Sequence, residues 1–354
     1  MRTLPALCIG LLAVLSALPA NASPATVAQG LAAGTVIPHF RAVAQAAHAQ
    51  SAAWSGFCAH RTTGDVEGLR AAYGKVSDAW AAVEFLRMGP GAAELRIERF
   101  NYWLDRQNAA GKALNAMLAS TDPQSLAPAV IAGGSAAGQG LPILERLIYG
   151  DADAALRAPG ADGDRRCAIG SAVAANLADI ADAIVTGWTA PDGAGPAIAA
   201  NKGWKVSFTD ADEAARVLLT DLFTGSEGLK DFKIAMMFHD EANPGAARLA
   251  EDARSGRSLR DIRIEFSAIR EAMDAYLAPA PAADRGRIDG AFAEVDARLT
   301  DIEAAEAATP AHSPERARAI QAALASYETL QQTTLALLPT ATGVTLGFNN
   351  LDGD

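Results

Sequence analysis

The sequence of 354 residues has few of the residue types from which catalytic and metal centres are commonly built. It holds five histidines, and no two of them lie three or four positions apart, so no helical zinc motif is present. No phosphate-binding glycine loop occurs. The segment Gly133-Gly134-Ser135-Ala136-Ala137 lacks the second glycine of a hydrolase nucleophile turn. The commonest zinc peptidases, serine hydrolases and P-loop proteins are therefore excluded.

Positive charge and aromatic side chains are also scarce. Thirty Lys and Arg residues face 41 Asp and Glu residues, which leaves a formal charge of −11, and aromatic residues make up 6% of the chain. A strongly acidic protein is repelled by nucleic acid and by anionic membrane surfaces. We therefore expect no nucleic-acid partner.

Long apolar runs are missing except at the start of the chain. Arg2, the apolar run Leu4–Leu18 and the sequence Ala20-Asn21-Ala22 form a secretory signal with a small-x-small cleavage site over residues 1–22. No later segment is expected to span a membrane. The sequence predicts a mature protein that begins near Ser23 in the periplasm, within the envelope of a Gram-negative bacterium.

Cysteine is rare, and removal of the signal leaves only Cys58 and Cys167. In an oxidising compartment an isolated pair more often forms a disulfide than stays reduced. We expect a disulfide between these two residues, and the alternative is a pair of buried thiols.

No stretch alternates apolar and polar residues with a period of two, whereas helical periodicity runs through most of the chain. This pattern predicts an all-α protein built from helical bundles: a first over residues 23–195 and a second over residues 196–354, with an apolar C-terminal tail docked on it. The expected long helices are Thr26–Cys58, Asp65–Met88, Ala93–Leu118, Arg165–Trp188, Thr209–Phe223, Glu227–Phe238, Ser258–Leu277, Ala283–Ala308 and Ser313–Leu338.

The most informative stretch is Gly140–Gly150, a short predicted helix with Pro142 in its first turn and Gly150 just beyond its end. Glu145 lies within the apolar stripe of this helix, where an unpaired charge is costly. It therefore needs a partner, which is an arginine, a metal, a backbone cap or a proton.

A similar sequence pattern occurs at residues 81–89, where Glu84 also precedes a glycine by five positions. Two interpretations stay open for each glutamate. One is a structural ion pair, with Arg87 for Glu84 and with the arginines at 96, 99 and 106 for Glu145. The other is a ligand carboxylate in a shared polar cleft, with Glu145 the more important of the two.

Several of these segments together resemble the imelysin-like family, over essentially the whole mature chain. They are the Cys58 segment, Trp80 with Glu84-Phe85-Leu86-Arg87-Met88-Gly89-Pro90, Arg99-Phe100-Asn101-Tyr102-Trp103, Gly140-Leu141-Pro142-Ile143-Leu144-Glu145 and Leu346-Gly347-Phe348-Asn349. The resemblance implies two four-helix-bundle halves related by a pseudo-twofold. It also implies an envelope protein that takes part in iron or haem uptake, or a metal-dependent peptidase of the M75 type.

The family motif Gly-x-His-x-x-Glu is matched by Gly140 and Glu145, but Pro142 stands at the histidine position. Loss of this nitrogen ligand favours a binding or accessory protein over a peptidase, and we expect no catalytic residues. The resemblance makes Glu145 and Glu84 the candidate metal ligands, iron or haem the candidate cofactor, and an outer-membrane or envelope protein the candidate partner. An envelope interaction protein without a small ligand is the remaining alternative.

Overall fold

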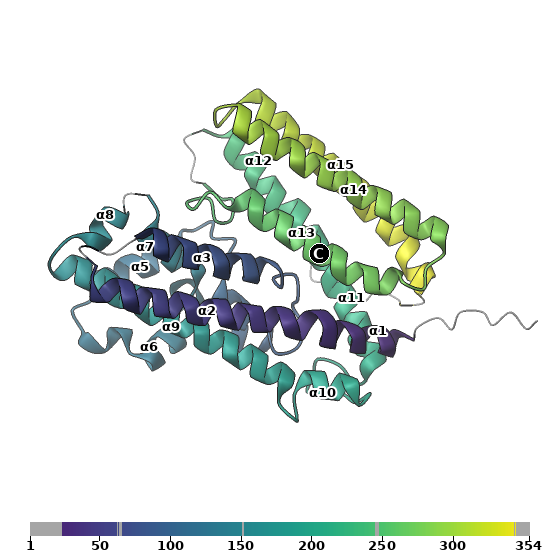
Figure 1. Ribbon diagram of the computed structural model, residues 1–354, viewed down its shortest axis with the longest axis horizontal. Coiled ribbons are helices and arrows are strands. Elements are labelled where there is room, and N and C mark those ends of the chain that lie inside the picture. Colours follow the sequence, from purple (N-terminus) through teal and green to yellow (C-terminus); the bar gives the residue numbers. More distant parts are fainter. Residues whose placement is uncertain are drawn as a thin grey trace, which may run out of the picture.

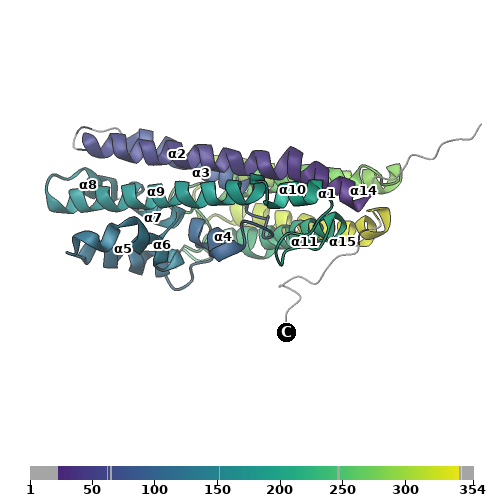
Figure 2. The ribbon, with the colours of Figure 1, turned by 90° about the horizontal axis from the view of Figure 1, so that it is seen from below.

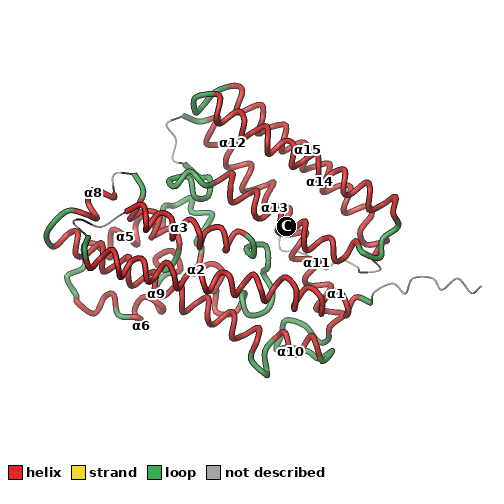
Figure 3. Tube along the Cα trace, viewed as in Figure 1, coloured by secondary structure: helices red, strands yellow, loops and turns green. Residues whose placement is uncertain are grey.

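The structure, a computed structural model, describes residues 23–61, 63, 66–150, 152–244, 248–342 and 344. Within these residues the chain consists of helices and loops without a β-strand, as Figure 3 shows. The predicted all-α class is confirmed. The predicted signal at residues 1–22 lies outside the described residues.

The N-terminal part is organised around three long helical stretches that pack side by side (Figures 1 and 2). The first is continuous from Pro24 to Ala59, with a π-helical turn between its two α-helical parts. The apolar residues of all three point into one core. These stretches are α1 (Pro24–Leu31) with η1 (Ala32–Val36) and α2 (Ile37–Ala59), then α3 (Val66–Ala81) and α9 (Ala161–Thr189).

Shorter helices fill the chain between α3 and α9, and another follows α9. Several of them lie on one side of the long helices in Figure 2. They are η2 (Ala93–Leu95), α4 (Arg96–Phe100), α5 (Ala109–Ala119), η3 (Pro123–Leu126), α6 (Pro128–Gly133), η4 (Ala136–Gly138), α7 (Leu141–Ile148), α8 (Ala152–Arg157) and α10 (Ala194–Ala199).

The C-terminal part is a second group of long helices, of which α14 and α15 form a hairpin on the outer side (Figure 1). Helix α13 packs against α3, and α1 packs against α11, so the two groups share a helical interface. The members are α11 (Ala211–Gly228), η5 (Leu229–Ile234), α12 (Ala235–Ala242), α13 (Ser258–Leu277), α14 (Ala282–Ala308) and α15 (Pro314–Thr342).

Three predictions about helix ends and breaks differ from the structure, and they concern four of the expected helices. The helix expected to reach Met88 ends at Ala81, and a turn follows it. The helix expected over Ala93–Leu118 is interrupted by a loop at residues 101–108, where Asp105 accepts the first backbone N–H groups of α5. Conversely, α11, η5 and α12 are continuous where two separate helices were expected. Periodicity does not encode side-chain to backbone hydrogen bonds such as those of Asp105, which fix the start of α5.

The predicted division into two domains falls inside α10, which packs against α1, α9 and α11. The boundary between residues 195 and 196 therefore stays a prediction. Of the C-terminal tail after Leu338, Val344 is buried, and residues 343 and 345–354 lie outside the described residues.

The predicted disulfide between Cys58 and Cys167 is confirmed, with the two Cα atoms 5.7 Å apart. It joins the end of α2 to the first third of α9 across a sequence separation of 109. Both helices belong to the N-terminal group, so the bond fixes the core in which the short helix of Glu145 is packed.

One helical stretch among the described residues, Ala161–Ala199, is long and apolar enough to cross a membrane by length and composition. Its mean hydropathy reaches 1.5, so the expectation that no later segment meets this criterion is wrong. Within the structure 56% of that apolar window is buried, which is typical of a core helix. The apolar residues of α9 are explained by its central position between α2 and the short helices.

Candidate functional site

The centre of the molecule holds a buried lysine surrounded by three glutamates. The Nζ atom of Lys233 lies 2.6 Å from Glu84, 2.7 Å from Glu251 and 2.6 Å from Glu265. All four side chains are at most 7% exposed. An ammonium group has three N–H donors, so the three carboxylates use its full donor capacity. We call these four residues the Lys233 cluster.

Four separate segments bring the cluster together. Glu84 lies on the turn after α3, Lys233 in the π-helical turn η5, Glu251 in the loop before α13, and Glu265 on α13. A π-helical turn rotates the side chains that follow it relative to a regular α-helix, and such turns are frequent at functional sites. The cluster therefore ties the N-terminal helices to the C-terminal group.

Backbone hydrogen bonds fix the turn that carries Glu84. The Asp221 carboxylate on α11 accepts the N–H groups of Arg87 and Met88, each at 2.8 Å. Gly89, at φ +67°, then turns the chain in a left-handed conformation that favours glycine. Burial raises the pKa of Asp221 to about 7, although both N–H bonds oppose this rise.

Asn101 connects two of the glutamates. Its side-chain amide donates to Glu251 at 2.5 Å and to Glu84 at 3.2 Å. Asn101 directly follows α4, where Phe100 stacks on Trp80 with ring centroids 4.1 Å apart. Both rings are buried, so they belong to the core.

The charges of the cluster do not balance. Desolvation disfavours the Lys233 ammonium, but the attraction of Glu251, Glu265 and Glu84 outweighs it and holds the pKa of Lys233 well above its usual value. Burial raises the pKa of Glu251 to about 8 and that of Glu265 to about 7. For Glu84 burial is outweighed by Lys233, and the pKa is lowered. One lysine thus neutralises one glutamate fully, and the other two hold protons more tightly than usual.

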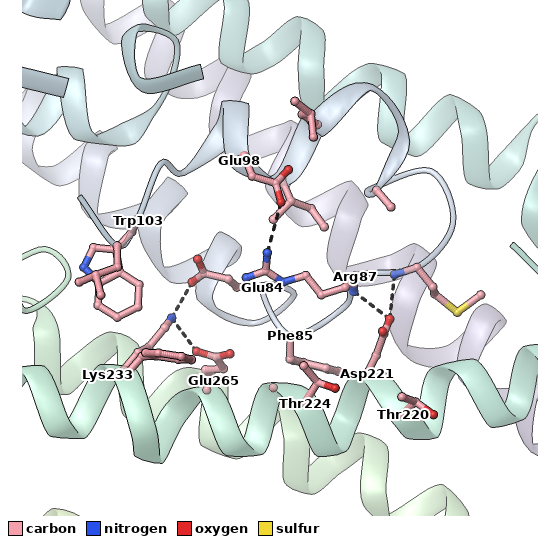
Figure 4. A pocket seen from close by; sticks show the side chains of 18 of the residues that line it. Glu84, Phe85, Arg87, Glu98, Trp103, Thr220, Asp221, Thr224, Lys233 and Glu265 are labelled. Atoms are coloured by element: carbon pink, nitrogen blue, oxygen red, sulfur yellow. Dashed lines mark hydrogen bonds and ion pairs between the residues drawn. The ribbon is translucent and has the colours of Figure 1, made fainter. Parts of the chain in front are cut away.

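A cavity of about 760 Å³ opens on one side of the cluster, as Figure 4 shows. Glu84, Lys233 and Glu265 form its polar end, and Arg87 and Glu98 form an ion pair of 3.6 Å at another wall. The apolar part of the lining consists of Phe85, Met88, Ala92, Leu95, Ile97, Trp103, Leu104, Val217 and Phe232. Mainly apolar walls with a few converging polar groups are typical of small-molecule sites of this volume.

Glu145 lies near this cavity in α7, whose Pro142 and Gly150 occupy the predicted positions. It is 4% exposed and accepts the backbone N–H of Ser255 at 2.9 Å. Burial, followed by the charge of Asp252, raises the pKa of Glu145 to about 7. Of the partners considered for Glu145, the structure therefore shows a backbone N–H group, and the raised pKa favours a bound proton as well.

Two of the three arginines expected beside Glu145 have other partners. Arg96 donates to the carbonyl oxygen of Pro90, and Arg99 donates to the side chain of Gln139. Among the described residues Glu145 has no ion pair within 4 Å. For Glu84 the lysine of η5, rather than the expected Arg87, makes the close ion pair.

Glu145 and Glu84 line two neighbouring cavities rather than a single one. Glu145 lines a small cavity of about 60 Å³ together with Asn101 and Glu251, and Trp103 lines both cavities. The loop segment 251–257 connects the two sites, because Glu251 joins the Lys233 cluster and Ser255 binds Glu145.

The same loop segment is held against α3 by further hydrogen bonds. Asp252 accepts the hydroxyl groups of Tyr73 and Ser77, both at 2.8 Å. Arg257 pairs with Asp78 of α3 and with Asp261 of α13. The loop is therefore anchored on both helix groups, and so are the carboxyl groups that it positions.

Gly140 has a structural reason for being glycine. A Cβ atom at this position would overlap the carbonyl oxygens of Arg99 and Phe100. The start of α7 thus packs directly on the backbone of α4, which places Glu145 close to Asn101.

The donor atoms of the site are poorly suited to a metal ion. Among the described residues no group of three or more His, Cys, Asp or Glu side chains is arranged to hold one. At the Lys233 cluster, the lysine ammonium already takes the position between the three carboxylates that a cation would need. The metal-ligand role of Glu145 and Glu84 stays a prediction.

Sequence reasoning found Glu84, Glu145 and the Asn101 segment but missed Lys233, Glu251 and Glu265. The only signal in the sequence was polar residues at apolar positions of predicted helices, and Lys233 and Glu265 each occupy such a position. Trp103 and Tyr102 are partly exposed and line cavities, whereas Trp80 and Phe100 belong to the core.

Comparison with known proteins supports one family. A family model described as imelysin, peptidase M75, matches residues 36–334. Among solved structures, an imelysin-like protein from Psychrobacter arcticum 273-4 superposes with a TM-score of 0.67 at 18% identity, covering 92% of this chain and 97% of the other. A putative iron-regulated protein A precursor from Parabacteroides distasonis ATCC 8503 also gives 0.67, at 13% identity and with coverage of 90% and 97%. No curated protein matches the sequence. At these identities the structural likeness concerns the fold.

Proposed function

Because the chain belongs to the imelysin family, we propose that it is a binding or accessory protein for iron or haem uptake in the periplasm of a Gram-negative bacterium. The name of the Parabacteroides structure, an iron-regulated protein, supports the link to iron. The signal sequence at residues 1–22 supports export, and the disulfide is in keeping with an oxidising compartment. The two helix groups are the two bundle halves of this proposal, related by a pseudo-twofold.

The observation that carries the proposal is the cavity beside the Lys233 cluster. Its volume of about 760 Å³ and its mainly apolar lining suit an organic ligand better than a bare ion. The iron would therefore arrive within an organic chelate or as haem. Glu84 contributes to the polar end of the cavity, and Glu145 supports the adjoining loop through Ser255.

The fit of haem itself is limited by the available axial ligands. Haem iron is usually held by histidine, cysteine, methionine or tyrosine. Among the described residues that line the cavity, Met88 alone is of these types, and it is 6% exposed. An iron chelate whose own atoms saturate the metal places no such demand on the protein, so we favour it over haem.

Ligand binding is tested by titrating the mature protein with ferric chelates, haem and ferric salt, and by measuring heat release and thermal stabilisation. A bound ligand stabilises only the folded state, so binding raises the melting temperature. Thr224→Trp fills the cavity from α11 and should abolish the shift. Arg216→Trp places the same side chain on an exposed position of α11 and should retain it. If no iron compound binds the wild-type protein, the uptake proposal is wrong.

The peptidase alternative is favoured by the description of the family as peptidase M75. Because Pro142 occupies the histidine position of the motif, we expect no cleavage of unfolded protein substrates with added divalent metals. Chelator-sensitive cleavage that is lost in Glu145→Ala would establish the peptidase instead. Export is tested separately by the intact mass of the periplasmic protein, which should lack residues 1–22.

A further inference from the structure

We propose that the cavity beside the Lys233 cluster selects a ligand that carries an organic cation, an ammonium or amidinium group, and that Glu265 is its principal contact. This inference rests on the proposed function only in taking this cavity as the ligand site. It adds the charge of the ligand and the residue that recognises it.

The first support is the charge of the lining. Four carboxyl groups, those of Glu84, Glu98, Asp221 and Glu265, face two basic side chains, those of Arg87 and Lys233. Figure 4 shows these groups around the cavity, with Glu84 and Glu265 both directed at Lys233. Since carboxyl groups outnumber basic side chains in the lining, a cation entering the cavity is favoured and an anion is opposed.

The second support is the unused bonding capacity of Glu265. A carboxylate offers about four acceptor sites. Glu265 is 3% exposed, and Lys233 is its one ion-pair partner among the described residues. Glu84, in contrast, accepts from both Asn101 and Lys233, and Asp221 accepts two backbone N–H groups. Glu265 is thus the carboxylate of the cavity that can accept a further charged donor.

Lys233 cannot donate a further hydrogen bond to the Glu265 carboxylate. Its three donors are divided among Glu84, Glu251 and Glu265. A second cation on the cavity side of Glu265 would bring the cluster closer to neutrality. A ligand ammonium group would therefore exchange its hydration shell for a charge-assisted hydrogen bond.

The third support is the aromatic wall. Trp103 and Phe232 line the cavity and are both partly exposed. The Trp103 ring already lies 6.0 Å from the Lys233 ammonium, measured to its centroid. Aromatic faces attract organic cations, and this attraction strengthens when the cation is desolvated. The cavity thus combines a free carboxylate acceptor with aromatic surfaces, a set that suits an organic cation.

The decisive experiment compares a ferric trihydroxamate chelate that bears a free ammonium group with the same chelate after acetylation of its amine. We expect the ammonium form to bind the mature protein at least about tenfold more tightly, because loss of one partner of a buried charge pair is costly. Equal affinity of the two forms would refute the selection of a cation while leaving iron binding intact. Tight binding of an iron-free amine such as benzylamine, with no binding of the acetylated chelate, would support the cation site and contradict the iron proposal.

Variants test the residue assignment. Glu265→Gln keeps the size of the side chain and should lower affinity for the ammonium chelate at least about tenfold, with affinity for the acetylated form unchanged. Glu271→Gln removes a half-exposed carboxylate of the same helix, α13, that does not line the cavity, and it should change affinity less than about threefold. If Glu265→Gln binds the ammonium chelate and the acetylated chelate more weakly by the same factor, Glu265 affects only the shape of the site, and its assignment as the cation contact is wrong.

Discussion

Replacement of Lys233 by methionine tests whether the buried cluster holds the two helix groups together. The variant keeps the length of the side chain but leaves Glu84, Glu251 and Glu265 without their shared cation. At distances of 2.6–2.7 Å and an effective dielectric constant of about 20, each pair contributes about 6 kcal/mol of gross attraction. Repulsion among the carboxylates and the desolvation of all four groups offset most of this sum.

The net cost of removing one partner from a buried ion pair is about 3–5 kcal/mol. We therefore expect Lys233→Met to lower the free energy of unfolding by that amount at pH 8. The melting temperature should fall by on the order of 6–10 °C, at about 2 °C per kcal/mol for a large domain. Lys230→Met is the matched control in the same π-helical turn. Lys230 pairs with Glu328 and Asp231, which are about half exposed, so its loss should cost at most about 1 kcal/mol.

The cost should depend on pH in a defined direction. Without the lysine, the folded-state pKa values of all three glutamates rise. Those of Glu251 and Glu265 move further above the unfolded value of about 4.3, and the lowering of the Glu84 pKa by Lys233 is lost. Such groups stabilise the folded state below the unfolded pKa, and this stability is lost as the pH rises. The deficit of Lys233→Met should therefore be larger at pH 8 than at pH 5, as measured by denaturant unfolding followed by circular dichroism. A variant as stable as Lys230→Met at pH 8, or a deficit independent of pH, would refute the reasoning.

Three further predictions concern the surroundings of the site. Replacing Cys58 and Cys167 by serine should lower the free energy of unfolding by up to about 4–5 kcal/mol, because the disulfide closes a loop with a sequence separation of 109. Free thiols in the denatured, unreduced wild-type protein would contradict the bond. Between pH 5 and pH 8 the free energy of unfolding of Glu145→Gln should rise by about 1–3 kcal/mol relative to that of the wild type. The reason is that a carboxyl group whose folded-state pKa is raised to about 7 destabilises the wild-type protein as the pH rises. A relative decrease of the same size in thermal melts would indicate a cationic partner of Glu145. Gly140→Ala should lower stability by about 1–3 kcal/mol through overlap with the α4 backbone, whereas Gly133→Ala, with open space around its Cβ position, should not; equal effects in unfolding experiments would contradict the packing of α7 on α4.

The sequence alone determined the fold class, the disulfide and the position of Glu145. Helical periodicity is a local property, so the long helices at 258–277 and 282–308 were predicted within one residue of their observed ends. Pro142 and Gly150 mark the ends of α7 because their backbone preferences are intrinsic. The disulfide followed from the number of cysteines and the compartment, without any knowledge of distance.

Only the tertiary structure decided the partners of the charged residues. Glu84 and Lys233 are 149 positions apart, and nothing in their own segments indicates that they meet. The sequence offered Arg87 as a partner because it lies one turn away, yet Glu84 lies in a turn beyond the helix end. The cluster forms because the end of α3, the turn η5 and helix α13 pack together at one buried place. A buried carboxylate is costly unless it is paired, and Lys233 is the cation within reach of the three glutamates. The end of α3 at Ala81 also depends on a distant helix. Asp221 of α11 accepts hydrogen bonds from the backbone N–H groups of Arg87 and Met88, in the segment that follows α3.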